Sequence, residues 1–130
     1  MDLSGLNQHQ RAAVTRTEGP LLVLAGAGSG KTRVITHRVV YLLERGVPAE
    51  AIVALSFTNK AADEMRERLH RMVGKAADAL VLGTFHSLGA AMMREQPDQF
   101  GVPKRFSILD QSDVYGIVRG VLRDLGYGGA

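Results

Sequence analysis

The feature that most constrains the fold is a glycine-rich segment over residues 25–32, with the sequence AGAGSGKT. A short, continuously apolar run at residues 21–24 precedes it, as expected for a central parallel strand buried on both faces. Apolar side chains at three- and four-residue spacings follow it and predict a helix that begins near Lys31. A strand, a glycine-rich turn and a helix in this order allow a backbone to wrap closely around a phosphate group.

The segment matches the phosphate-loop pattern G-x-x-x-x-G-K-[ST], except that Ala25 holds the first glycine position. This departure is mild, because that residue only begins the turn out of the strand. Glycine lets backbone N–H groups approach a triphosphate closely. We expect Lys31 to act as the catalytic residue at the β and γ phosphates and the Thr32 hydroxyl to coordinate Mg²⁺. The expected phosphate-binding residues are Ala25, Gly26, Ala27, Gly28, Ser29, Gly30, Lys31 and Thr32.

Further strand and helix signals alternate along the chain. Residues 51–57 and 80–84 are apolar and strand-sized, and a helix is expected after each of them. Thr58 or Asn59 can cap the first of these helices, and the second is expected from Ser87 to about Glu95. The order strand, helix, strand, helix, strand predicts an α/β fold with a parallel sheet and right-handed crossovers.

The pattern changes after Gln96. Prolines and a glycine break the chain, and a helix with a strong apolar stripe is expected after Asp110. The pair Asp110–Gln111 is the nearest candidate for an acidic metal-binding pair, but its position favours a plain helix cap. We therefore expect one domain over residues 1–95 and the start of a second over residues 96–130.

Composition narrows the classes of function. The 130 residues carry 16 Lys and Arg against 13 Asp and Glu, and this excess permits an anionic partner without requiring one. The chain has no cysteine, which excludes disulfide scaffolds, thiolate zinc sites and cysteine nucleophiles. No apolar run approaches the ~18 residues of a membrane helix, and Met1 begins no secretory signal. We expect a cytoplasmic protein with no membrane partner.

Four segments outside the loop carry a family resemblance. Residues 6–10 (LNQHQ) resemble the Q motif, residues 57–65 (FTNKAADEM) motif Ia, and residues 83–87 (GTFHS) motif Ib of UvrD/Rep/PcrA-type superfamily 1A DNA helicases. Residues 106–110 (FSILD) resemble the start of their helical insertion. The resemblance implies an incomplete P-loop NTPase (RecA-like) parallel sheet, followed by the start of that inserted subdomain.

The resemblance also implies that ATP is the nucleotide. The amide of Gln10 can donate and accept at once, which suits the N6/N7 edge of adenine. Spacing alone leaves open a solvated glutamine on a first helix. By the resemblance, Arg33 packs its guanidinium against the adenine face; otherwise it would be an exposed helix arginine.

By the resemblance, DNA contacts are expected where the second and third strands end, which is also the edge at which parallel sheets bind ligands. Phe57 can stack on a base, although an aromatic residue at a strand end is otherwise more often core. Thr58, Asn59 and Lys60 can hold phosphates or simply cap a helix, and both interpretations can hold together. The expected DNA contacts are Phe57, Thr58, Asn59, Lys60, Thr84, Phe85 and His86.

The resemblance implies the N-terminal portion of an ATP-dependent 3′–5′ DNA helicase that binds ATP, Mg²⁺ and single-stranded DNA and serves in DNA repair or replication. No apolar strand ends in the Asp-Glu pair that hydrolysis requires, so we expect little or no turnover by these residues alone. The alternative is a standalone, non-catalytic module that binds nucleotide or single-stranded DNA. A small P-loop kinase fails on the same missing acidic pair.

Overall fold

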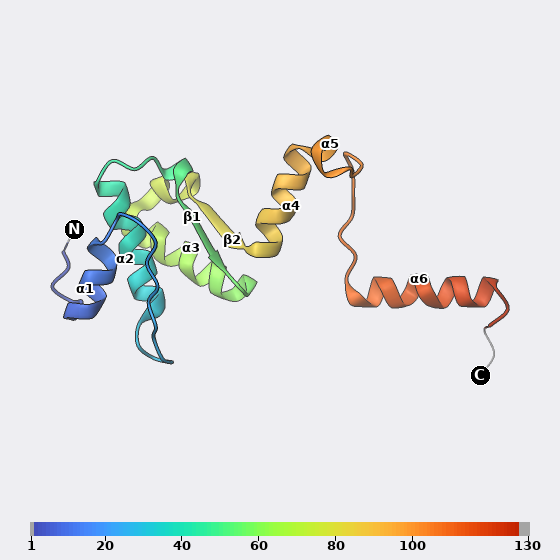
Figure 1. Cartoon of the computed structure of the whole chain (residues 1–130), viewed down its shortest axis with the longest axis horizontal. Coiled ribbons are helices and arrows are strands. Elements are labelled where there is room, and N and C mark those ends of the chain that lie inside the picture. The colour runs from blue at the N-terminus through green and yellow to red at the C-terminus, as the bar shows by residue number, and fades with distance from the viewer. Residues whose placement is uncertain (1, 128–130) are drawn as a thin grey trace. The chain divides into compact units, whose positions relative to one another are not determined.

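A computed structural model describes residues 2–127 of the chain (Figure 1). Two strands and six α-helices follow one another, with two short 3₁₀ helices between them, at Ala49–Ala51 and Gly74–Ala79. The strands are β1 (Val53–Ser56) and β2 (Val81–Thr84). The helices are α1 (Gln8–Thr15), α2 (Lys31–Glu44), α3 (Asn59–Val73), α4 (Phe85–Glu95), α5 (Pro97–Phe100) and α6 (Gln111–Asp124).

The chain divides into two compact units, Met1–Gly89 and Ala90–Ala130. The predicted domain boundary after residue 95 stays a prediction. No helix within residues 2–127 is long and apolar enough to cross a membrane.

The sheet of the first unit consists of β1 and β2, which pair in parallel. Val53 lies opposite Val81, and Ser56 lies opposite Thr84, so both strands end at the same edge. The predicted strands at residues 51–57 and 80–84 are therefore confirmed. The first is shorter than predicted at both ends, and the second begins one residue later. The fold is α/β with a parallel sheet, as the alternation of strand and helix signals predicts.

The predicted first strand at residues 21–24 is wrong. This segment is extended but is not a strand, and no strand within the described residues pairs with it. Its side chains are exposed instead of buried, Leu22 at 82% and Leu24 at 88%. An apolar run becomes a buried strand only when neighbouring strands supply hydrogen bonds and cover both faces, and residues 2–127 supply neither.

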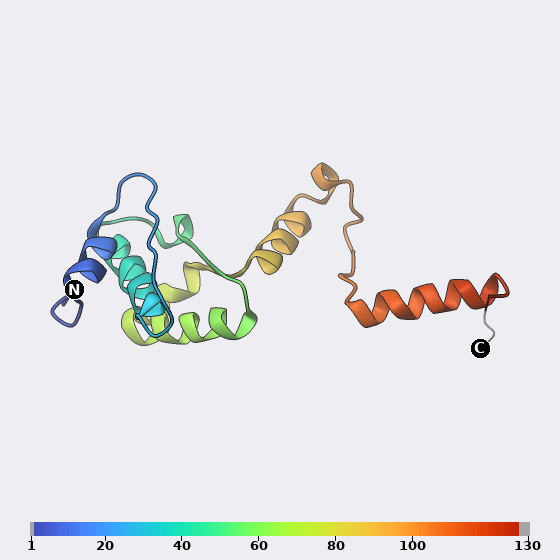
Figure 2. The same ribbon diagram turned by 60° about the horizontal axis from the view of Figure 1, so that its bottom comes forward.

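α2 and α3 begin where their sequence signals indicate. α2 starts at Lys31 directly after the glycine-rich loop, and its last turn is followed by Gly46 and Pro48. α3 is capped by Thr58, whose hydroxyl accepts a hydrogen bond from the Ala61 N–H at 3.2 Å. Figure 2 shows α1 beside α2, and α3 along the two strands.

The core of the first unit lies where α2 and α3 meet the sheet. Leu69 of α3 is fully buried at its centre. The buried residues of this cluster are Val39, Val40, Ile52, Ala54, Met65, Leu69, Ala77 and Leu80. α1 adds the buried side chains of Ala13 and Val14 against α2. Burial of this apolar surface holds the elements that carry the candidate site.

In the second unit, Asp110 is the N-cap of α6. Its Oδ1 accepts from the Asp113 N–H at 2.8 Å, and the Asp113 carboxylate accepts from the Asp110 N–H at 3.0 Å. The Ser112 hydroxyl and the Asp113 N–H both bond the ionised form, and these bonds lower the pKa of Asp110. The interpretation of Asp110 as a helix cap is confirmed. No three His, Asp or Glu side chains gather as a metal site within residues 2–127.

Candidate functional site

The glycine-rich loop turns the chain from the extended segment at residues 21–24 into α2. Gly30 is the N-cap of α2 at φ 82°, and Gly28 has φ 73°. Both values lie in the left-handed region, which L-residues with a side chain rarely adopt. No side chain of the described residues caps the first turn of α2, so its N–H groups stay available at the positive end of the helix dipole.

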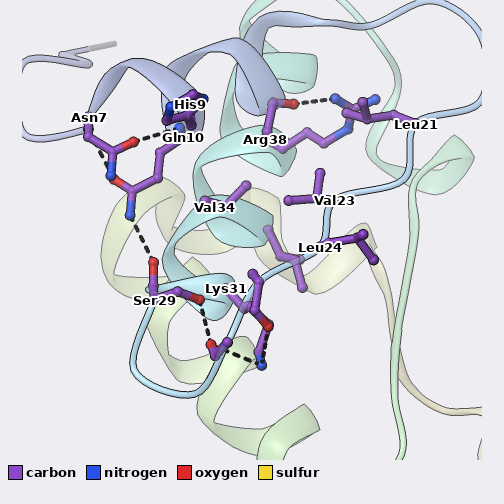
Figure 3. Close-up of a pocket in the computed structure, with 14 residues that line it drawn as sticks. Asn7, His9, Gln10, Leu21, Val23, Leu24, Ser29, Lys31, Val34 and Arg38 are labelled. Carbon is purple, nitrogen blue, oxygen red and sulfur yellow. Dashed lines mark hydrogen bonds between the residues drawn. The ribbon is translucent and has the colours of Figure 1, made fainter.

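The side chain of Lys31 points toward the first residues of this loop (Figure 3). Its Nζ donates to the carbonyl oxygens of Ala25 at 3.1 Å and Gly26 at 3.3 Å. The Ser29 hydroxyl donates to the same Gly26 carbonyl at 2.7 Å. The loop thus brings one ammonium group and the N-terminus of a helix together, and both favour an anion. Thr32 is exposed in the first turn of α2, beside Lys31.

Gln10 of α1 binds directly to the loop. Its Nε2 donates to the Ser29 carbonyl at 3.0 Å, and its Oε1 accepts from the Asn7 N–H at 3.0 Å. Asn7 in turn accepts from the Gln10 N–H at 2.9 Å, which completes a capping box at the start of α1. These bonds fix the amide of Gln10 but leave one Nε2 hydrogen and one Oε1 lone pair free of them.

A cavity of about 560 Å³ lies between α1, the extended segment and α2 (Figure 3). This volume falls in the range of small-molecule sites. One wall is apolar and includes three of the four exposed side chains that the sequence assigned to a buried strand, Leu21, Val23 and Leu24. The polar side chains that line it are Asn7, His9, Gln10, Ser29, Lys31 and Arg38. The predicted Gln10, Ala25, Gly26, Ser29 and Lys31 therefore share one cavity.

Arg33 lies on the first turn of α2 and is exposed. Its guanidinium lies against Gly5, where a Cβ atom would collide with the Arg33 Nη2. The Gly30 Cβ position lies 3.0 Å from the Gln10 Nε2. Arg33 thus lies beside the segment that leads into α1, and Gln10 of α1 lies beside Gly30 at the end of the loop.

A second group of predicted residues lies at the carboxyl ends of β1 and β2. The rings of Phe57 and Phe85 have centroids 5.4 Å apart and are tilted by 44°. Both are exposed, at 87% and 55%. The register that places Ser56 opposite Thr84 brings the two rings together. An aromatic pair that faces solvent at a sheet edge is available to stack with a planar ligand.

Thr84 differs from its neighbours, because it is buried. Its hydroxyl accepts from the Ser87 N–H at 3.2 Å, and the Ser87 hydroxyl accepts from the Thr84 N–H at 2.8 Å. This reciprocal cap starts α4 at Phe85, two residues before the predicted Ser87. The exposed members of the predicted DNA set are Phe57, Thr58, Asn59, Lys60, Phe85 and His86.

Sequence reasoning did not identify Asn7 and Arg38 as residues of the site. The spacing Asn7-x-x-Gln10 is a capping-box pattern and could have indicated the first of them. Arg38 donates to backbone carbonyls at the end of α1, and no local pattern signals that contact.

Comparison with known proteins finds relatives over most of the chain. Residues 6–127 match the family described as UvrD/REP helicase N-terminal domain. The chain is 49% identical over 123 residues to the ATP-dependent DNA helicase PcrA of Bacillus subtilis strain 168. It is 46% identical over 123 residues to the PcrA of Staphylococcus aureus strain Mu50. Each alignment covers 94% of this chain but 17% of the relative, so the chain spans about one sixth of their length. The chain belongs to the UvrD/REP helicase N-terminal domain family.

Proposed function

We propose that the chain is the nucleotide- and DNA-binding N-terminal part of an ATP-dependent 3′–5′ DNA helicase of the cytoplasm. Its strands and loop would form the opening part of a RecA-like motor domain over residues 1–95, with the inserted subdomain starting at residue 96. The bond from Gln10 to the phosphate loop carries this proposal. It joins an amide suited to adenine and a loop suited to phosphate in one cavity.

The phosphates of ATP would bind at the N-terminus of α2. Lys31 already lies at the opening of the loop and would transfer its hydrogen bonds from the Ala25 and Gly26 carbonyls to phosphate oxygens. Thr32 is exposed in the adjacent position and would supply one oxygen ligand to Mg²⁺. A single protein ligand fits this ion, which takes its remaining oxygens from phosphates and water. When bound, Mg²⁺ would neutralise part of the phosphate charge.

Adenine would be read by Gln10. The free Nε2 hydrogen can donate to adenine N7, and the free Oε1 lone pair can accept from the adenine N6 amino group. Guanine carries an acceptor, O6, where adenine carries that donor, so it would lose one of the two bonds. The guanidinium of Arg33 would stack on the base from the side of Gly5.

Single-stranded DNA would cross the edge where β1 and β2 end. Phe57 and Phe85 are exposed and close enough to act as one stacking platform. Asn59, Lys60 and His86 are exposed beside them and would contact the phosphate backbone. Thr84 would support the DNA contact indirectly, because its hydroxyl caps α4 and so fixes the start of the helix that carries Phe85 and His86.

Replacement of Lys31 tests the nucleotide site. Lys31→Ala removes a charged donor to the phosphates, and we expect ATP affinity to fall about 10- to 150-fold. Lys75→Ala is the matched control, because Lys75 is exposed in the 3₁₀ helix Gly74–Ala79. Calorimetric titration of the chain measures both. In the natural protein, Lys31→Ala should also abolish DNA unwinding. Unchanged affinity and unwinding in that variant would refute the assignment.

A further inference from the structure

Arg38 joins α2 to the far end of α1. It is half-buried, and its Nη1 donates to the Ala13 carbonyl at 2.6 Å (Figure 3) and also to the Arg16 carbonyl. The two acceptors lie in the last turn of α1 and at its C-cap. Arg38 stands 25 residues after the first acceptor and 22 after the second.

These bonds serve a helix that has little support of its own. α1 has eight residues, and helices of that length are marginal in isolation. The last carbonyls of a helix lack partners within it and carry the negative end of the helix dipole. α1 has no basic residue in its last turn. The positive charge at the C-terminal end of α1 is therefore supplied by Arg38 of α2, and its hydrogen bonds hold α1 against α2.

α1 is consequently held at both ends by polar bonds to the segment that contains the phosphate loop and α2. At its first turn, Gln10 donates to the Ser29 carbonyl of the loop. At its last turn, Ala13 accepts from Arg38. Val14, the residue after Ala13, is fully buried. Loss of the bond at one end would free the helix to rotate about the other and shift the Gln10 amide.

We propose that Arg38 is a positioning residue for base selection: by fixing the end of α1 on α2, it holds Gln10 in register with the phosphate loop. The inference rests on the proposed ATP site and deepens it. Arg38 also lines the cavity, but the proposed effect is exerted through the position of Gln10 and requires no contact between Arg38 and the nucleotide. A purely structural role would weaken the binding of ATP and GTP alike, whereas a positioning role acts on the preference between them.

The experiment measures ATP and GTP affinity of the natural protein with fluorescent nucleotide analogues. Arg38→Met keeps most of the side-chain stem and removes the donors. We expect it to lower the ratio of ATP to GTP affinity by about three- to tenfold, the effect of losing one hydrogen bond to the base. Arg38→Lys retains a charged donor and should restore part of the ratio. Gln10→Ala should lower the ratio as well, and adding Arg38→Met to it should change the ratio no further.

Arg45→Met is the matched control. Arg45 directly follows α2, and its guanidinium lies over the Tyr41 ring at 5.2 Å and donates to the Tyr41 hydroxyl. It makes none of the bonds to α1, so the ratio should stay at the wild-type value.

Equal weakening of ATP and GTP in Arg38→Met, with the ratio unchanged, would overturn the proposal. If Arg38→Met does not fold, Arg38→Lys is compared with the wild type, and hydrogen exchange measures whether α1 is less protected in the variant. A less protected α1 together with a wild-type ratio of ATP to GTP affinity would also overturn the proposal. The proposed function fails separately, when Lys31→Ala binds both nucleotides as tightly as the wild type does. In that case this inference is overturned with it.

Discussion

Removing the ring of Phe57 tests the proposed DNA contact in quantitative terms. The side chain is 87% exposed at the end of β1, and the Phe85 ring is its aromatic neighbour, 5.4 Å away between centroids. A side chain this exposed contributes little to the core, so Phe57→Ala should leave the fold in place. The ring would instead contribute by stacking on a base.

The expected loss of affinity can be worked from these values. Base–aromatic stacking is worth about 1–3 kcal/mol per base, which corresponds to roughly a 5- to 150-fold rise in Kd. The aromatic pair with Phe85 is worth at most about 1.5 kcal/mol, and exposure to water reduces that figure. Phe57→Ala should therefore reduce DNA affinity strongly while the free energy of unfolding falls by less than about 1.5 kcal/mol.

Fluorescence anisotropy of a labelled oligo-dT at fixed salt provides the assay. Phe57→Ala and Phe85→Ala should each weaken binding, and their effects should not add, because the rings form one platform. The slope of affinity against salt should stay unchanged, since no phosphate contact is lost. Phe100→Ala, a half-exposed ring on α5, is the control. Wild-type affinity in Phe57→Ala, or an equal loss in Phe100→Ala, would refute the reasoning.

Three further predictions address the fold, the second unit and the loop. Leu69→Ala removes a fully buried side chain and should cost about 2–5 kcal/mol in urea unfolding; an unchanged midpoint would contradict the core assignment. Hydrogen bonds from Ser112 and Asp113 lower the pKa of Asp110 below its ordinary value of 3.8. The carboxylate therefore stabilises α6 fully above pH 3.8, and this stabilisation is lost as the pH falls through the lowered pKa of the folded protein. NMR titration of that carboxyl should give a midpoint below 3.8, and a higher midpoint would exclude the cap. Gly30→Ala forces a side chain into φ 82° at a cost of about 1–2 kcal/mol and should weaken ATP binding, whereas full affinity would show that the left-handed turn is dispensable.

The elements fixed by local patterns could be predicted from the sequence. The start of α2 at Lys31 and the cap of α6 at Asp110 depend on residues within a few positions of one another, and the apolar runs that become β1 and β2 are visible in the sequence although the strands pair across 28 residues. The pairing of Phe57 with Phe85 was also accessible, because parallel strands end at one edge and the order of elements predicts a parallel sheet.

The errors lie where structure depends on distant partners. The apolar run at residues 21–24 has the composition of a central strand, but burial requires neighbours that its own sequence cannot specify. Thr84 stands at the predicted edge with its side chain buried and its hydroxyl accepting from the nearby Ser87 N–H, and its DNA contact stays a prediction. The bonds of Arg38 join residues more than twenty positions apart, beyond the reach of any periodic pattern.

Mapping ATP onto the backbone tests the central claim most directly. The chain, labelled with ¹⁵N, would be titrated with ATP and Mg²⁺ while amide chemical shifts are recorded. We predict that the largest changes fall on the amides of residues 26–32, which form the proposed phosphate loop, and on the side-chain amide of Gln10, which lines the cavity beside it. If these signals stay unmoved at saturating ATP, or the changes gather on α3 instead, the account is wrong.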